Sequence, residues 1–590
     1  MADSLLSRLG EFLQRRRPWY TLPRLLAMPR LVEIRNQSRK ENLYDTEEPA
    51  LECSDTPQDV DAAVRSARTA DGTFNDLRCP RMGAVGARFG RNVSLEHTHP
   101  DTANLLRPNP RAVSTGLMTR HQFQPVAKLN LLAAAWIQFE IHDWFSHKNS
   151  SLDDAIEVPN GDVGTPMRIP RTEPSTAPQG SMRPPAYENE VTHWWDGSQI
   201  YGSTAEVTAR HRAFEGGKLK IREDGLLAVN PDTRIEHTPF TNNWWVGLSM
   251  LHHLFVREHN SICDFLKSKY PAWTDDELYH KARLINAALM AKIHTVEWTP
   301  AIISHPVIKV AMRTNWYGLA GTDLQDVFEF LDDSEVLGGI VGSKADHHAA
   351  PYSLTEEFIA VYRMHPLMPD DFTFRSAATD EVLEERSLTE VAGRASRDII
   401  ERIAMKDLFY SFGRMHPGAL TLHNYPRHLQ NLVQEDGSVI DVATIDILRD
   451  RERGVPRYNE FRRLFHKERV TSFEELTDNA TWREELRTLY NNDIEAVDLM
   501  VGLFAEPLPE GFGFSETAFR VFILMASRRL KSDRFFTDDY RPEVYTQEGL
   551  DYIHNNGLVS VLKRHFPELA PAMEGTENPF APWNAGSALV

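Results

Sequence analysis

The chain has 590 residues, and its 84 acidic and 65 basic side chains leave a formal net charge of −19 at pH 7. This excess of negative charge disfavours nucleic acid as a main partner, because a protein surface that binds nucleic acid needs clustered lysine and arginine. The three cysteines, an odd and sparse set, argue against a disulfide framework and an obligate secreted context, and their spacing excludes a cysteine-based zinc site.

Residues 1–40 are unusually basic, with nine lysine and arginine residues against three acidic ones. Apolar side chains at helical spacing predict a basic amphipathic helix near the start: Leu5, Leu6, Leu9, Phe12 and Leu13. Such a helix either lies in a membrane interface or packs on the main domain with its arginines in solvent. We therefore divide the chain into an N-terminal segment, residues 1–40, and one domain over residues 41–590.

No apolar run approaches the ~20 residues of a membrane-spanning helix, and the best candidate, residues 129–139, is about half that length. The N-terminal segment also lacks the uninterrupted apolar core and the small-residue cleavage site of a signal peptide. The sequence therefore predicts an intracellular protein that is soluble or attached to a membrane at its periphery.

The first strong helical pattern covers residues 126–145. Within it Gln138 and His142 are four residues apart and therefore share a face, and Asp143 follows directly. Residues 45–125 and 146–190 flank this helix and are rich in turn signals. We expect the first of these regions to be extended loop structure and the second to be a long surface loop.

The segment 192–203, with the sequence THWWDGSQIYGS, combines a carboxylate with two hydroxyl groups. Thr192, Trp194, Asp196 and Ser198 alternate along it, so their side chains can point the same way in an extended loop. Calcium prefers carboxylate, hydroxyl and carbonyl oxygens of this kind. Taken alone, however, an Asp-Gly-Ser turn is more often just a turn, and both interpretations stay open.

Two long helical patterns follow, over residues 244–269 and 275–303. The second contains His294 in an otherwise apolar stretch, with Thr299 five residues later. A histidine in such a place is either a hydrogen-bonded core residue or part of a site.

The segment 355–372, with the sequence TEEFIAVYRMHPLMPDDF, reads as a short helix with a capping residue, Thr355, and an end at Pro366. On a helix, Tyr362 and His365 share a face, about 4.5 Å apart along the axis. A histidine that held a haem iron would then lie beside a tyrosine able to pass it an electron. A buried histidine and a core tyrosine are the simpler interpretation of this pair taken alone.

Two further helical patterns cover residues 388–412 and 515–531. Arg520 lies inside the apolar run AFRVFILM of the second, where a charged group is costly unless it is paired. Its only local acidic partner is Glu516, four residues earlier. Strand signals are few and no phosphate-binding glycine loop is present, so the sequence predicts one large, mostly α domain.

Several segments together resemble the haem peroxidase–cyclooxygenase superfamily, and within it the fatty-acid α-dioxygenases. They are WIQFEIHDW at 136–144, REHN at 257–260, AVYRMHPLMPDDF at 360–372 and DILRDRERGVPRYNEF at 446–461. HTVEWT and SETAFRVFILMASRRL are closer to the α-dioxygenases than to the cyclooxygenases. The resemblance covers roughly residues 27–566 and implies a single haem-peroxidase-like helical domain.

The resemblance assigns roles to residues at matching positions. His142 would be the distal histidine with Gln138 as its pocket neighbour, His365 the iron ligand and Tyr362 the radical tyrosine. Asp446 would accept the other N–H of His365. The substrate carboxylate would be held by Arg520, His294 and Thr299, and one calcium ion by Asp143, Thr192, Trp194 (through its carbonyl), Asp196 and Ser198.

These roles imply haem b and a tyrosyl radical that adds O2 to the α-carbon of a long-chain fatty acid, giving a 2-hydroperoxy fatty acid. Some relatives bind haem covalently through a carboxylate just before the distal histidine. Here that residue is Ile141, so we expect non-covalent haem. The alternatives are a fatty-acid dioxygenase of other regiochemistry, a haem peroxidase, or a non-catalytic haem-binding or scaffold protein; the last requires neither His142 nor Tyr362.

Overall fold

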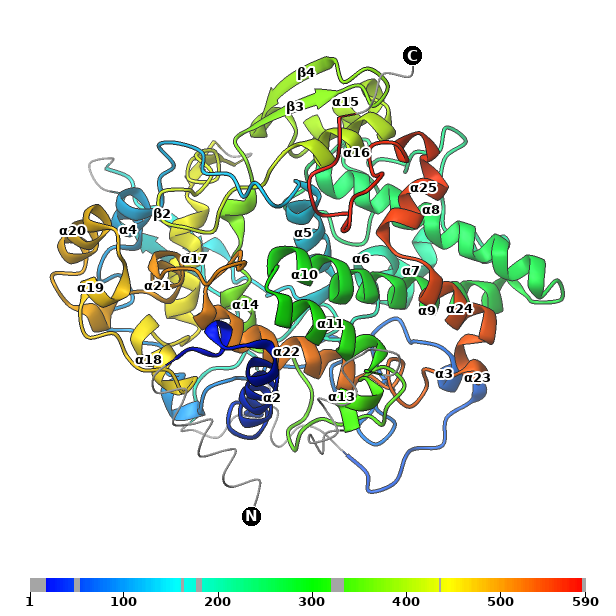
Figure 1. Cartoon of the computed structure of the whole chain (residues 1–590), viewed down its shortest axis with the longest axis horizontal. Coiled ribbons are helices and arrows are strands. Elements are labelled where there is room, and N and C mark those ends of the chain that lie inside the picture. The colour runs from blue at the N-terminus through cyan, green and yellow to red at the C-terminus, as the bar shows by residue number, and fades with distance from the viewer. Residues whose placement is uncertain are drawn as a thin grey trace.

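The computed structural model describes residues 17–46, 53–160, 164–176, 183–319, 334–434 and 437–585, which form a mostly helical body (Figure 1). In these ranges the strands pair as three short antiparallel hairpins: β1 (Ala155–Val158) with β2 (Met167–Pro170), β3 (Asp371–Arg375) with β4 (Val382–Ser387), and β5 (Leu432–Val433) with β6 (Val439–Ile440). The predicted mostly α fold with little β structure is confirmed.

Helices at the centre of the body carry the residues that matter for function. α5 packs against α8, α8 against α9, and α14 against α22. Most side chains of these helices are buried, which is why their sequences are apolar on more than one face. Their bounds are α5 (Leu132–Trp144), α8 (Val246–Lys269), α9 (Asp275–Ile293), α14 (Glu356–Val361) and α22 (Glu516–Ser532).

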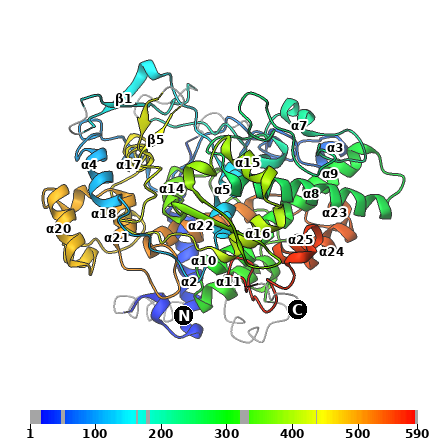
Figure 2. The ribbon, with the colours of Figure 1, turned by 90° about the horizontal axis from the view of Figure 1, so that it is seen from above.

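The other helices surround this centre, as Figure 1 and Figure 2 show from two directions. At the left lie α4 (Pro110–Val113), α17 (Val442–Glu452), α18 (Tyr458–Leu464), α19 (Phe473–Leu476), α20 (Ala480–Leu489) and α21 (Leu499–Ala505). At the right lie α3 (Ala62–Ser66), α7 (Ala205–His211), α23 (Pro542–Tyr545), α24 (Gln547–Asn555) and α25 (Leu558–His565). The rest are α2 (Arg24–Glu41), α6 (Ser198–Tyr201), α10 (Thr299–Ile302), α11 (Pro306–Tyr317), α13 (Ser334–Gly338), α15 (Ala395–Arg402) and α16 (Met405–Arg414).

The helix predicted over residues 275–303 is interrupted. α9 ends at Ile293, a π turn covers His294–Trp298, and α10 follows. Pro300 explains the wider turn, because a proline cannot donate a backbone hydrogen bond to the preceding turn. A π turn has more residues per turn than an α-helix, so residues five apart such as His294 and Thr299 come to one side.

The helix that carries Tyr362 is shorter than the sequence predicted. Thr355 caps α14 as expected, its hydroxyl accepting from the N–H of Phe358, but the helix ends at Val361. Tyr362 is the C-cap, and His365 begins a separate 3-10 turn. The prediction that Tyr362 and His365 share one face of a helix is therefore wrong. Pro366 has no N–H and constrains the residue before it, so the helix unwinds one turn earlier.

Other predicted boundaries also need correction. α5 begins at Leu132 instead of residue 126. The pattern over 388–412 consists of a 3-10 turn followed by α15 and α16, and Gly393, at a positive φ of 54°, precedes α15. The loop predicted over 146–190 contains the β1–β2 hairpin, and short helices α3 and α4 interrupt the loops of 45–125. α8 and α22 agree with their predictions to within two residues.

The described part of the N-terminal segment packs on the main body. Trp19 and the apolar face of α2 are buried, and α2 contacts α22 and α11. Within α2, Arg24 is exposed, whereas Arg39 is buried and pairs with Glu335 at 2.9 Å, and Arg30 pairs with Glu33. Leu25 and Leu26, by contrast, are 61% and 49% exposed. The predicted helix formed by Leu5 to Leu13 lies outside the described residues.

The cysteines also differ from expectation. Cys53 and Cys79 form one disulfide between two loop segments, and Cys263 is free and buried. Their spacing along the chain gave no sign that these loops meet. Among the described residues, no helix has the length and apolarity to cross a membrane.

Candidate active site and haem site

A narrow cavity lies between the π turn, α11, α14 and the C-terminal half of α22. Two residues with predicted roles in the carboxylate site, His294 and Thr299, line it together with Tyr362. The full lining is Trp195, His294, Thr295, Thr299, Met312, Asn315, Phe358, Tyr362, Ala526, Arg529 and Leu530. The cavity thus combines one cation and a few polar groups with an apolar wall, as ligand sites commonly do.

Arg529 is the cation of this cavity. Its guanidinium lies 4.1 Å from the ring centre of Trp144 and 4.4 Å from that of Trp195. The side chain is buried, yet its Nε and Nη2 atoms have no hydrogen-bond partner in the described part of the chain. Cation–π contacts stabilise the buried charge only in part, so a guanidinium in this state can accept an anionic ligand.

Arg520 does not reach the cavity, which corrects the sequence prediction. Its Nε donates to Glu516 Oε1 at 2.8 Å, and the same glutamate also pairs with Lys467. Arg520 and Arg529 are nine residues apart on α22, about two and a half turns, so they point to opposite faces. Only one of the two can face Tyr362.

His294 presents a defined hydrogen-bond donor. Its Nδ1 accepts from Trp136 Nε1 at 3.3 Å, and an indole N–H can only donate. Burial lowers the pKa of His294 well below its usual value, so the ring is neutral and carries its proton on Nε2. The hydroxyl of Thr299 donates to the carbonyl oxygen of His294 at 2.9 Å and must redirect its proton to donate to a ligand.

Tyr362 is buried among aromatic rings. Phe358 lies 4.5 Å away between ring centres, and Trp144 meets it edge-on at 5.4 Å. Burial strongly raises the pKa of Tyr362, so the phenol stays protonated. A neutral phenol is the form that can lose a hydrogen atom.

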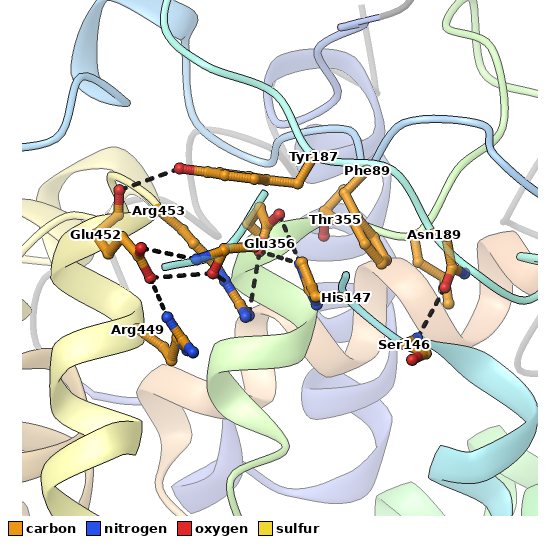
Figure 3. Close-up of polar contacts among 12 residues, drawn as sticks. Phe89, Ser146, His147, Tyr187, Asn189, Thr355, Glu356, Arg449, Glu452 and Arg453 are labelled. Carbon is orange, nitrogen blue, oxygen red and sulfur yellow. Dashed lines mark hydrogen bonds and ion pairs between the residues drawn. The ribbon is translucent and has the colours of Figure 1, made fainter. Parts of the chain in front are cut away.

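A buried hydrogen bond and an ion pair fix the start of α14, as Figure 3 shows. His147, just beyond the end of α5, meets Glu356 at 3.0 Å and stacks on Phe89 with ring centres 4.2 Å apart. Arg453, beyond the end of α17, lies 3.9 Å from the same carboxylate. The segments that carry His142 and Asp446 are thereby tied to the helix that leads to Tyr362.

His365 has the geometry of an oriented metal ligand. Its Nδ1 lies 2.8 Å from Asp446 Oδ2, and Asp446 also accepts from Tyr425 at 2.9 Å and from Arg363 at 2.7 Å. Burial tends to raise the pKa of Asp446, but its interactions with His365, Arg363 and Tyr425 outweigh burial and lower it. The ring is 38% exposed, and its Nε2 makes no hydrogen bond to the described residues, so it can bind iron.

His142 and Gln138 both lie on α5, but the two side chains have different surroundings from each other. His142 is buried against Phe240, its Nδ1 has no partner in the described chain, and burial lowers its pKa to about 3. It is therefore neutral and able to accept a proton. Gln138 is already bonded at both ends, donating to the carbonyl of Asn243 and accepting from Trp245.

The predicted calcium ligands come together in part. Ser198 donates through its N–H to Asp143 and through its hydroxyl to Asp196, and Thr192 lies 3.5 Å from the Ser198 hydroxyl. The second carboxylate oxygen of Asp143 is buried without a partner in the described chain, and burial together with Asp196 raises its pKa. Asp196 already pairs with Arg283 at 3.3 Å, so the unpartnered oxygen of Asp143 is the one left for a cation. Among the described residues no cluster of three or more histidine, cysteine, aspartate or glutamate ligands occurs, so hydroxyls and carbonyls must supply the rest.

Comparison with known proteins decides the family. Residues 67–578 match the animal haem peroxidase family. The chain is 37% identical to alpha-dioxygenase 1 of Capsicum annuum over 99% of this chain and 92% of that protein, and 38% identical to the alpha-dioxygenase PIOX of Nicotiana tabacum over 96% and 90%. The chain belongs to the alpha-dioxygenases of the animal haem peroxidase family.

Solved alpha-dioxygenases have the same fold as this chain. A variant of the Oryza sativa fatty acid alpha-dioxygenase, crystallised with palmitic acid, superposes with a TM-score of 0.90 at 35% identity, covering 100% of this chain and 98% of that one. The Arabidopsis thaliana enzyme gives 0.89 at 36% identity, covering 99% and 92%. The suspected resemblance is confirmed, and the chain is an alpha-dioxygenase enzyme that, as an animal haem peroxidase, binds haem.

Sequence reasoning missed Arg529. It lies in the last turn of α22, where basic residues are usual because they favour the helix dipole, so Arg528 and Arg529 attracted no notice. The sequence did contain one indication that Arg529 faces the interior. It lies seven residues after Phe522 and three after Ala526, so it shares a helical face with these apolar residues.

Proposed function

We propose that this alpha-dioxygenase uses haem b and a radical on Tyr362 to add O2 to the α-carbon of long-chain fatty acids, giving 2-hydroperoxy fatty acids. The observation that carries the proposal is the buried guanidinium of Arg529, whose Nε and Nη2 have no hydrogen-bond partner in the described chain, in one cavity with Tyr362. A cation there selects an acid, and the carbon next to the carboxylate is then the nearest one to the tyrosine.

The substrate carboxylate would accept hydrogen bonds from Arg529 and from Nε2–H of His294, with Thr299 as a third donor. Charge-assisted bonds of this type are short and directional, so they fix the head of the substrate. Met312, Phe358 and Leu530 offer the apolar surface for the first carbons of the tail.

The haem would be held by His365 and supplies, when bound, the one-electron oxidation of Tyr362. Asp446 makes His365 a stronger electron donor. His142, whose Nδ1 has no partner among the described residues, would move a proton when a peroxide activates the enzyme, with Gln138 one turn earlier on α5. Because Ile141 stands where a linking carboxylate would be needed, we infer that the haem is bound without a covalent link.

The tyrosyl radical then takes one hydrogen atom from the α-carbon and becomes a phenol again. O2 adds to the carbon radical, and the resulting peroxyl radical recovers a hydrogen atom from Tyr362. The net change is the insertion of one O2 into one C–H bond, and the radical returns to Tyr362 for the next substrate.

Oxygen uptake with palmitate, followed by mass spectrometry of the product, tests the proposal. We expect oxygen consumption that depends on the fatty acid and a hydroperoxide at carbon 2. Oxygen at another carbon would favour a dioxygenase of other regiochemistry. Peroxide consumption without oxygen uptake would favour a peroxidase.

We also propose that one calcium ion is bound by Asp143, Thr192, Trp194 through its carbonyl, Asp196 and Ser198. It would neutralise the two buried carboxylates beside the end of α5 and so brace the helix that carries His142. Replacing Asp196 by asparagine is expected to lower calcium affinity about 10- to 100-fold and to weaken haem retention. Elemental analysis of the unchelated wild type checks this, and a calcium content near zero would contradict it.

The N-terminal segment, residues 1–40, is proposed to touch a membrane surface. The support is the exposed pair Leu25 and Leu26 at the start of α2, in a segment with an excess of basic residues. Replacing both leucines by glutamate is expected to reduce binding to anionic liposomes without changing thermal stability. Equal co-sedimentation of the two proteins would end this proposal.

A further inference from the structure

One buried hydrogen bond behind the cavity has no role in the mechanism so far. Glu140, on α5, is fully buried, and its Oε2 accepts from Trp195 Nε1 at 2.7 Å. Its other carboxylate oxygen has no partner in the described part of the chain. A buried carboxylate satisfied at only one oxygen is costly, so its presence calls for an explanation.

The indole that Glu140 holds lies under both polar groups of the proposed carboxylate site. Trp195 contacts the guanidinium of Arg529 at 4.4 Å and the ring of His294 at 5.2 Å, edge-on. Trp144 contacts the same two groups, at 4.1 Å from Arg529 and 5.2 Å from His294, and meets Trp195 edge-on at 5.8 Å. Arg529 and His294 are thus both positioned by the same two indole rings.

Both rings face Glu140, but Trp195 is the one whose N–H donates to it at hydrogen-bond distance, 2.7 Å. The Nε1 of Trp144 has no partner in the described chain, whereas the Nε1 of Trp195 is anchored on Glu140. Packing holds both buried indoles, and the hydrogen bond adds a directional restraint on Trp195. In the described chain, Nε and Nη2 of Arg529 have no hydrogen bond that would hold the guanidinium instead. The position of the guanidinium therefore depends on the Trp195 ring, and the position of that ring on Glu140.

We propose that Trp195 and Glu140 are positioning residues that set where the substrate carboxylate is held relative to Tyr362, and hence which carbon is oxidised. This inference rests on the proposed function, because it needs Arg529 as the carboxylate anchor. Glu140 acts as the hydrogen-bond acceptor for Trp195. Neither residue touches the reacting carbon.

The chain contains a matched control for this hydrogen bond. Trp244 Nε1 donates to Glu236 at the same distance, 2.7 Å, and both residues are buried, but neither lines the cavity. Trp195→Phe and Trp244→Phe remove the same kind of bond and the same atoms. Any difference between them in substrate handling then reflects position and not lost stability.

Trp195→Phe is expected to raise the KM for palmitate about tenfold and to yield hydroperoxides at more than one carbon, with normal haem absorbance. Trp244→Phe is expected to lower the Tm similarly while KM and product position stay as in the wild type. Glu140→Gln, which keeps an acceptor oxygen, should behave like the wild type, and Glu140→Leu should reproduce Trp195→Phe. Because Trp195 lies beside Asp196, calcium content is measured in every variant and should not change.

The inference would be overturned if Trp195→Phe had the same KM and the same product as Trp244→Phe. It would also be overturned if Glu140→Leu had the same KM and product as Glu140→Gln. If Glu140→Leu does not fold, the two tryptophan variants decide alone. A separate result would contradict the proposed function itself: an Arg529→Met enzyme that keeps the wild-type preference for palmitate over its methyl ester. If Arg529→Met removes that preference and Trp195→Phe does not weaken it, only the positioning role is wrong.

Discussion

Tyr362→Phe is expected to reduce fatty-acid oxygenation to background while haem stays bound. The phenylalanine keeps the ring that packs on Phe358 and Trp144, and loses only the O–H from which a hydrogen atom is taken and to which it returns. Without that atom the hydrogen abstraction proposed for Tyr362 cannot start. Oxygen uptake with palmitate and the Soret absorbance, measured on the same sample, check both halves of this prediction.

Tyr545→Phe is a suitable control, because it also removes a buried hydroxyl, which donates to the carbonyl of Phe535 away from the cavity. It should retain oxygenation. Electron paramagnetic resonance after peroxide addition should show a tyrosyl radical in the control and a different or absent signal in Tyr362→Phe. Oxygen consumption by Tyr362→Phe at the wild-type rate would show that the radical resides elsewhere.

The second large effect is expected from Arg529→Met. Methionine keeps an unbranched side chain against Trp144 and Trp195 but cannot bind a carboxylate. Losing a charge-assisted hydrogen bond costs about 1.5–3 kcal/mol, so the KM for palmitate should rise roughly tenfold to hundredfold. The wild type should oxidise methyl palmitate poorly, and the variant should treat the acid and the ester alike.

Arg520→Met is the matched control on the same helix. Arg520 is paired with Glu516, so its loss should destabilise the fold by about 1–3 kcal/mol and leave KM and the acid-over-ester preference intact. Thermal unfolding and steady-state kinetics on both variants separate the two roles. The assignment would be reversed if Arg520→Met removed the preference and Arg529→Met kept it.

Much of the fold could be predicted from the sequence because long apolar periodicities define helices. α8 and α22 were placed to within two residues, and the resemblance of short segments indicated the family. Within the site, His365 and Asp446 were paired correctly by their position in those segments, and they lie 2.8 Å apart. The residues of a short segment and the order of the segments along the chain were enough to identify this pair.

Two kinds of feature could not be predicted: which face of a buried helix meets the site, and where a helix departs slightly from regular geometry. Choosing between Arg520 and Arg529 requires knowing which face of a doubly buried helix meets Tyr362, and both faces of α22 are buried. The end of α14 at Val361 and the π turn before Thr299 shift side chains by a fraction of a turn. Periodicity averaged over a window does not register shifts of that size.

The place of α22 in the chain has a consequence for biosynthesis. Synthesis runs from the N-terminus, so the segments with His142, His365 and Asp446 are made before Arg529, and the residues of the iron site are complete before the substrate anchor exists. α22 then packs between α14 and α2, and Glu516 at its start accepts from Trp19, almost 500 residues earlier. Nascent chains stalled before and after α22 test this order: oxygenation of a fatty acid should require α22, which contacts both α14 and the segment around Trp19.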